Sequence, residues 1–128
     1  PDIQSYNATT HTFKKYTDYN GKDFSHSIDK NGLIYFISDE ANGEYNLYTL
    51  AAGKTKALTK FNTSIKAPQV NANGGKVVFE KDYQLFLYDA AKNNTSKVDI
   101  NIGLIHYYQK NYKRRTLIYY LTYQFLQN

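Results

Sequence analysis

The chain of 128 residues contains no cysteine, methionine or tryptophan and only two prolines. Without cysteine it can form neither a disulfide framework nor a thiolate zinc site. No apolar run is long enough to cross a bilayer, because the most apolar stretch, residues 117–126, is about half of the roughly 20 residues that a spanning helix needs. The sequence therefore predicts no membrane span.

Tyrosine and phenylalanine are abundant, with 14 and 7 copies. Aromatic and β-branched residues favour strands, and the low proline content is compatible with strands throughout. Hydrophobic residues make up 41% of the chain and charged residues 21%, which is typical of a globular protein and not of a disordered one. Composition alone therefore favours a folded β protein.

The basic character is unevenly distributed along the chain. Residues 1–100 hold 12 lysines against 11 acidic residues, so they are nearly neutral. Residues 101–128 contain no acidic residue and four cations, Lys110, Lys113, Arg114 and Arg115. The chain therefore divides into a nearly neutral part, 1–100, and a basic, tyrosine-rich tail, 101–128.

A short pattern occurs twice, about 42 residues apart. Residues 27–36 read SIDKNGLIYF and residues 69–79 read QVNANGGKVVF. In each copy an Asn-Gly turn, which supplies the positive φ of a tight hairpin, leads into an apolar strand. A period of about 40 residues with four short strands per unit is typical of a β-propeller.

The repeat predicts an all-β fold, a partial β-propeller of about two and a half four-stranded antiparallel blades over residues 1–100. The chain begins at the third strand of a unit. Residues 45–50 carry apolar side chains on both faces, as expected for a blade between two neighbours. A generic antiparallel sandwich is the alternative, and the repeated order of turn, strand and loop favours the propeller. The expected strands span residues 2–6, 12–17, 26–29, 33–38, 45–50, 54–59, 67–71, 76–80, 83–88 and 95–100.

The repeat resembles that of TolB-type propellers, in which a turn, an apolar strand ending in Ser, a strand ending in Asp and a Leu-Thr pair recur. The positions that carry the match are Asn31, Gly32, Ser38, Leu58, Thr59, Pro68, Tyr88 and Asp89. Residues 45–89 resemble more narrowly the N-terminal propeller of bacterial tricorn-like serine peptidases. The match departs from the family pattern at His26, where the next unit has Pro68, and it ends near Ile100.

The resemblance implies a fragment of a large, multidomain serine peptidase that is periplasmic or otherwise exported; a cytoplasmic location stays open. In such proteins the propeller guides peptide substrates towards a distant catalytic centre. The implied role of this chain is therefore non-catalytic peptide gating or binding. The alternative is a protein-binding scaffold module of another TolB-type propeller protein.

Contacts with a peptide or protein partner are expected from loops at the blade ends, at Asp39, Glu40, Asn42, Lys60, Asn62 and Ile65. Open blade faces and unpaired strand edges predict a homo-oligomer.

No catalytic or cofactor pattern is present. The three histidines, His11, His26 and His106, lack metal-ligand spacing, and there is no Gly-x-Ser-x-Gly motif. Residues 18–23 have the composition of a calcium loop without the register of an EF-hand. Those residues, and the acidic residues at 39, 40 and 44, are interpreted as solvated loops. We therefore expect no enzyme activity, metal or cofactor in this chain.

The tail allows two hypotheses. Residues 101–128 contain no Asp, Glu, Pro, Ala or Val, a bias expected from an AT-rich coding sequence read in a shifted frame. The tail is then a non-native end; alternatively it is a true C-terminal helix or strand pair. Lys113, Arg114 and Arg115 beside tyrosines also suggest nucleic-acid binding, but four cations give only weak, salt-sensitive binding. Nucleic acid is thus the least favoured partner.

Overall fold

The computed structural model describes residues 1–100, which form ten strands and no helix. The expectations for the tail, its nucleic-acid contacts and its possible frameshift included, lie outside the described residues. The strands are β1 (Gln4–Asn7), β2 (Thr12–Lys15), β3 (Asp23–Ile28), β4 (Ile34–Ser38), β5 (Asn46–Ala51), β6 (Lys54–Ala57), β7 (Ile65–Val70), β8 (Lys76–Lys81), β9 (Gln84–Asp89) and β10 (Asn94–Lys97).

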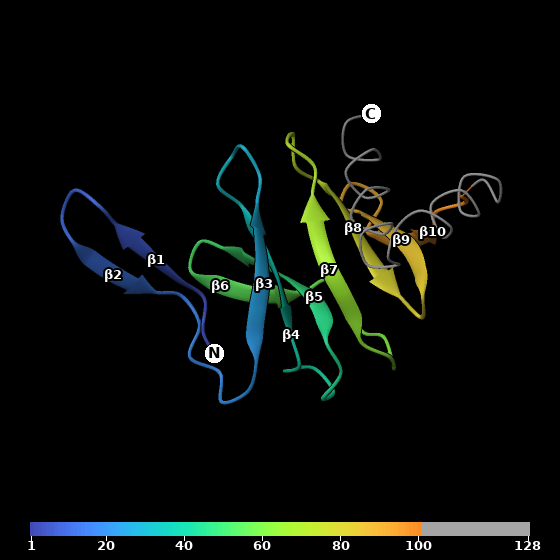
Figure 1. Ribbon diagram of the computed structural model, residues 1–128, viewed down its shortest axis with the longest axis horizontal. Coiled ribbons are helices and arrows are strands. Elements are labelled where there is room, and N and C mark those ends of the chain that lie inside the picture. Colours follow the sequence, from blue (N-terminus) through green and yellow to red (C-terminus); the bar gives the residue numbers. More distant parts are fainter. Residues whose placement is uncertain (101–128) are drawn as a thin grey trace, which may run out of the picture.

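The strands form three antiparallel sheets in chain order. β1 and β2 make a hairpin, β3 to β6 make a four-stranded sheet, and β7 to β10 make a second four-stranded sheet. Figure 1 shows the hairpin and the two sheets following one another along the long axis of the molecule. This arrangement confirms the prediction of a partial propeller with two and a half blades. We call the hairpin blade A, the β3–β6 sheet blade B and the β7–β10 sheet blade C.

The first strands of blades B and C begin earlier than the sequence predicts, at Asp23 and Ile65. A bulge interrupts each of them, between Phe24 and Ser27 in β3 and between Lys66 and Gln69 in β7. Ser25 and Ala67 in these bulges have positive φ angles of 53° and 50°. The bulge breaks the alternation of side chains, which is why the sequence pattern revealed only the second half of each strand.

Blade B packs on both of its faces. Tyr35, Ile37 and Leu47 lie in a core cluster with Ile65 and side chains of blade C. On the opposite face, a second cluster joins blade B to Ile3 of the segment before β1, and its members from blade B are Phe36, Tyr48 and Leu50. The prediction that both faces of this blade are apolar is confirmed. Full burial of each such side chain contributes roughly 1.5–3 kcal/mol to stability.

Turns of neighbouring blades also contact one another. Lys30 donates through its backbone N–H to the carbonyl of Ala72 at 3.1 Å and through Nζ to Asn73 Oδ1 at 2.9 Å. Gly74 has a φ of +79°, and a side chain there would collide with the carboxylate of Asp29. Only glycine fits both the backbone angle and the close approach.

The meander places the loops at two opposite ends of the blades. Antiparallel strands turn alternately at one end and then at the other. The backbone N–H of Ala90 donates to the carbonyl of Gly75 at 2.8 Å, which joins two turns of the first end. The first rim therefore holds residues 29–33, 52–53, 71–75 and 90–93, and the second rim holds residues 39–45, 58–64 and 82–83.

Candidate binding surface at the second rim

The second rim contains most of the residues that the sequence marks as a binding surface. Glu40, Asn42, Lys60 and Asn62 are exposed there, and Asp39 is half-buried. Ile65 differs, because its side chain is fully buried in the core between blades B and C. The structure thus groups five of the six predicted residues on one rim and places the sixth beneath it.

A buried asparagine in β5 joins the two loops of this rim. Asn46 donates through Nδ2 to the carbonyls of Glu44 at 3.1 Å and Phe61 at 3.2 Å. Its Oδ1 accepts hydrogen bonds from Thr59 Oγ1 at 3.0 Å and from the Phe61 backbone N–H at 2.6 Å. Asn46 was not identified as a site residue from the sequence. Because asparagine is uncommon in strands, its presence in an apolar strand is a signal that could have pointed to it.

Further hydrogen bonds tie the loops at their surface. Asn42 Nδ2 donates to the carbonyl of Phe61 at 2.9 Å, and Ser64 Oγ donates to Glu44 Oε2 at 2.6 Å. The backbone N–H of Tyr45 donates to Ser64 Oγ at 2.9 Å. The two loops therefore form one braced surface from which the remaining polar side chains project.

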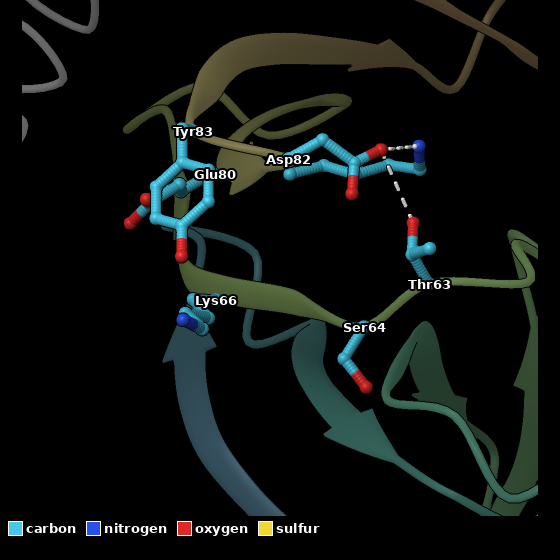
Figure 2. A pocket seen from close by; sticks show the side chains of 7 residues that line it. Thr63, Ser64, Lys66, Glu80, Asp82 and Tyr83 are labelled. Atoms are coloured by element: carbon cyan, nitrogen blue, oxygen red, sulfur yellow. Dashed lines mark hydrogen bonds and ion pairs between the residues drawn. The ribbon is translucent and has the colours of Figure 1, made fainter.

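A pocket of about 240 Å³ opens beside this surface, at the junction of β7 and β8 (Figure 2). Thr63 Oγ1 donates to Asp82 Oδ2 at 3.2 Å, and Lys81 Nζ donates to the same oxygen at 2.5 Å. These hydrogen bonds, chiefly the one from Lys81, hold the pKa of Asp82 below its ordinary value. The pocket lining is Thr63, Ser64, Lys66, Glu80, Lys81, Asp82 and Tyr83.

The ammonium group of Lys81 also lies over aromatic rings. Its Nζ is 5.1 Å from the ring centre of Phe61 and 5.5 Å from that of Phe86. A cation over an aromatic face is attracted by the negative charge density of the ring. Between blades B and C, the cation that lies over these rings is therefore the ammonium group of Lys81.

Glu40 lines another pocket, of about 460 Å³, between blades A and B, together with Asp18, Tyr19 and Asp23 of the acidic segment. Within residues 1–100, no group of three or more histidine or acidic side chains could hold a metal ion. His11 accepts or donates a 2.8 Å hydrogen bond with Tyr6 on the hairpin, and His26 is exposed.

No protein-family model matches the chain, and no curated protein matches it significantly. Its fold is similar to that of TolB from Acinetobacter baumannii, with a TM-score of 0.67 and 19% identity over 79% of this chain and 27% of TolB. It is also similar to the tricorn protease, with a TM-score of 0.64 and 22% identity over 78% of this chain and 10% of the protease. Residues 1–100 thus have the fold of part of a TolB- and tricorn-like propeller.

Proposed function

We propose, from the TolB- and tricorn-like propeller fold of residues 1–100, that this chain is a non-catalytic, peptide-binding part of a larger, exported, tricorn-like serine peptidase. The observation that carries the proposal is the braced second rim. A surface that is already ordered loses little conformational entropy when it binds an extended peptide. The free energy of the hydrogen bonds that its exposed polar groups make to a peptide then contributes to binding affinity and is not offset by the cost of ordering the loops.

Three rim side chains are placed to contact a peptide. Glu40, Lys60 and Asn62 are exposed, and their side chains take part in no hydrogen bond or ion pair within residues 1–100. Asn42 and Asp39 already bind other parts of the rim, Asn42 to Phe61 and Asp39 Oδ1 to the backbone N–H of Lys22 at 3.0 Å. Ile65 supports the rim from the core.

Binding of a labelled extended peptide to the full chain tests this proposal by fluorescence anisotropy. We expect saturable binding that weakens several-fold in the double variant Lys60→Ala, Asn62→Ala. The matched control is Lys92→Ala, which removes an exposed lysine from the first rim. Absence of saturable binding, or an equal loss in the control, would overturn the proposal.

The likeness to TolB favours a second candidate function, a module that binds a folded protein partner. The two candidates differ in what lies beside this segment in the parent gene. PDZ and serine-peptidase coding regions downstream support the first, and their absence in every reading frame supports the second.

A homo-oligomer is also proposed. Within residues 1–100, β1 pairs only with β2, so its other edge has no partner strand there. The rings of Tyr6 and Phe13 contact each other on this hairpin in a tilted arrangement, with ring centres 4.9 Å apart, and the two residues are 52% and 73% exposed. An unpaired edge beside exposed rings favours association with another copy.

A further inference from the structure

The pocket between blades A and B is strongly acidic. Three carboxylates line it, those of Asp18, Asp23 and Glu40, against the single ammonium group of Lys54. The rings of Tyr16 and Tyr19 form part of the wall. Residues 1–100 are nearly neutral, with 12 lysines and 11 acidic residues, so the pocket is a local excess of negative charge.

Asp23 is the buried member of this group. It begins β3, is only 3% exposed, and its carboxylate makes no hydrogen bond or ion pair within residues 1–100. Yet no fully enclosed side-chain oxygen in those residues lacks a partner, so this carboxylate must reach the open space of the pocket. Within residues 1–100 this carboxylate has no partner of opposite charge, so a cation that enters the pocket can pair with it.

The junction between blades B and C, called the sister junction below, shows which residues the repeat has at the positions equivalent to those around Asp23. The backbone N–H of Ile3 donates to Thr17 Oγ1 at 2.9 Å, and that of Leu47 donates to Thr59 Oγ1 at the same distance. The backbone N–H of Asp23 donates to the Pro1 carbonyl as that of Ile65 donates to the Tyr45 carbonyl. Residues 17–23 therefore correspond one to one with residues 59–65.

This correspondence pairs Asp23 with Ile65 and Tyr19 with Phe61. Ile65 fills its junction as a fully buried apolar side chain. The same site between blades A and B holds a carboxylate and leaves a pocket. At this position the junction between blades A and B therefore has an acidic residue, Asp23, where the sister junction has the apolar residue Ile65.

The cation of the sister junction is missing here. In the strand registers Asp23 lies opposite Ser38, and Ile65 lies opposite Lys81. Ser38 thus stands where Lys81 places its ammonium group over Phe61 and beside Asp82. The junction between blades A and B keeps the aromatic ring, as Tyr19, and gains carboxylates, but it has no ammonium group at this position.

The negative charge at this junction affects the pKa of two tyrosines. Burial raises the pKa of Tyr19, and the carboxylates of Asp39, Glu40 and Asp23 raise it further. The pKa of Tyr48 is raised by burial first and then by Glu40. Gly21 allows the arrangement, because any side chain there would collide with the Tyr19 ring and the Asp39 carboxylate.

We propose that the pocket between blades A and B binds an organic cation, the ammonium or guanidinium group of a lysine or arginine side chain in a bound peptide. This deepens the proposed peptide-binding function by naming its substrate class. The bound cation would pair with Asp23 and Glu40 and rest against Tyr19. It would occupy the position that Lys81 occupies in the sister junction.

Titration of the full chain with N-acetyl-lysine amide and N-acetyl-arginine amide, followed by NMR, tests this directly. N-acetyl-norleucine amide is the neutral control ligand, and free methylammonium shows whether the cation alone suffices. We expect saturable binding of the basic amides, weakened about tenfold or more in Asp23→Asn. Asp99→Asn, which removes an exposed carboxylate elsewhere, is the matched control and should leave the affinity unchanged.

Asp18→Lys is a second variant, needed if Asp23→Asn fails to fold. It installs at the pocket edge the lysine that the repeat has at residue 60, and it should likewise weaken binding by about tenfold or more. Equal binding of norleucine and lysine amides, or unchanged affinity in both variants, would overturn the cation pocket. If charge-independent peptide binding to the second rim then persists, the proposed function survives without this pocket. If basic amides bind but no extended peptide does, the pocket stands and the proposed function fails.

Discussion

Thr59 Oγ1 donates a 3.0 Å hydrogen bond to Oδ1 of Asn46, and the same hydroxyl oxygen accepts the backbone N–H of Leu47 at 2.9 Å. This pair fastens the end of blade B to its own third strand. Both side chains are buried, so neither can exchange its partner for water.

Asn46→Ala should therefore destabilise the chain by about 1–3 kcal/mol, because it leaves the buried hydroxyl of Thr59 and the N–H of Phe61 without their acceptor. Urea unfolding followed by circular dichroism measures the loss. Asn94→Ala, at an exposed position of β10, is the control and should change stability little. An unchanged unfolding midpoint for Asn46→Ala would show that the network adds nothing.

Two glycines form a matched pair for the blade turns. Gly32 and Gly74 have φ angles of +81° and +79°, but a side chain would meet open space at Gly32 and the Asp29 carboxylate at Gly74. Gly32→Ala should cost about 1–2 kcal/mol for the backbone angle alone. Gly74→Ala should cost clearly more, since it adds the collision. Equal losses in thermal unfolding would contradict the close packing of the two turns.

Stability should fall at alkaline pH. Burial is the main cause of the raised pKa of Tyr35, Tyr48 and Tyr88 in the folded chain. Each group therefore contributes stability that is fully present below the ordinary tyrosine pKa of about 10 and is lost as pH rises through the folded pKa. The free energy of unfolding, measured from pH 8 to 11 on the wild type and on Tyr88→Phe, checks this.

Tyr88→Phe should flatten the alkaline decline. The substitution also removes a 3.1 Å hydrogen bond from Tyr88 to Asn93 Oδ1. The alkaline decline of the variant is therefore measured relative to the variant's own stability at neutral pH. A decline as steep as that of the wild type would exclude Tyr88 as a source of the pH dependence.

Association through blade A is tested by sedimentation velocity. The variant Tyr6→Thr, Phe13→Thr should shift the full chain towards the monomer, because it removes the two contacting, exposed rings of the open hairpin. Ile28→Thr, which removes a side chain that is 56% exposed on β3, is the control. A wild type that stays monomeric at high concentration would contradict the proposed homo-oligomer.

Much of the fold is predictable from the sequence because its signals are local. The Asn-Gly turns and the alternation of apolar residues depend on neighbours a few positions apart, and they indicate the sheets and their order. The bulges at Ser25 and Ala67 were missed, since neither residue type favours a positive φ.

The binding features depend on residues far apart and were only partly predictable. Glu40 and Lys60 could be expected on a rim because loops follow strand ends. The pocket at Asp23 could not, because its space exists only where blade A meets blade B and where Ser38 replaces a lysine. Laying residues 17–23 on 59–65 was the signal that could have revealed it.

The central claim, that the second rim binds peptides, is tested most directly by mapping amide chemical shifts of the full chain during titration with an extended basic peptide. We predict shifts at Glu40, Lys60 and Asn62 and around Asp23, with residues 71–75 and 90–93 of the first rim unaffected. Shifts confined to the first rim, or none at saturating peptide, would contradict the account.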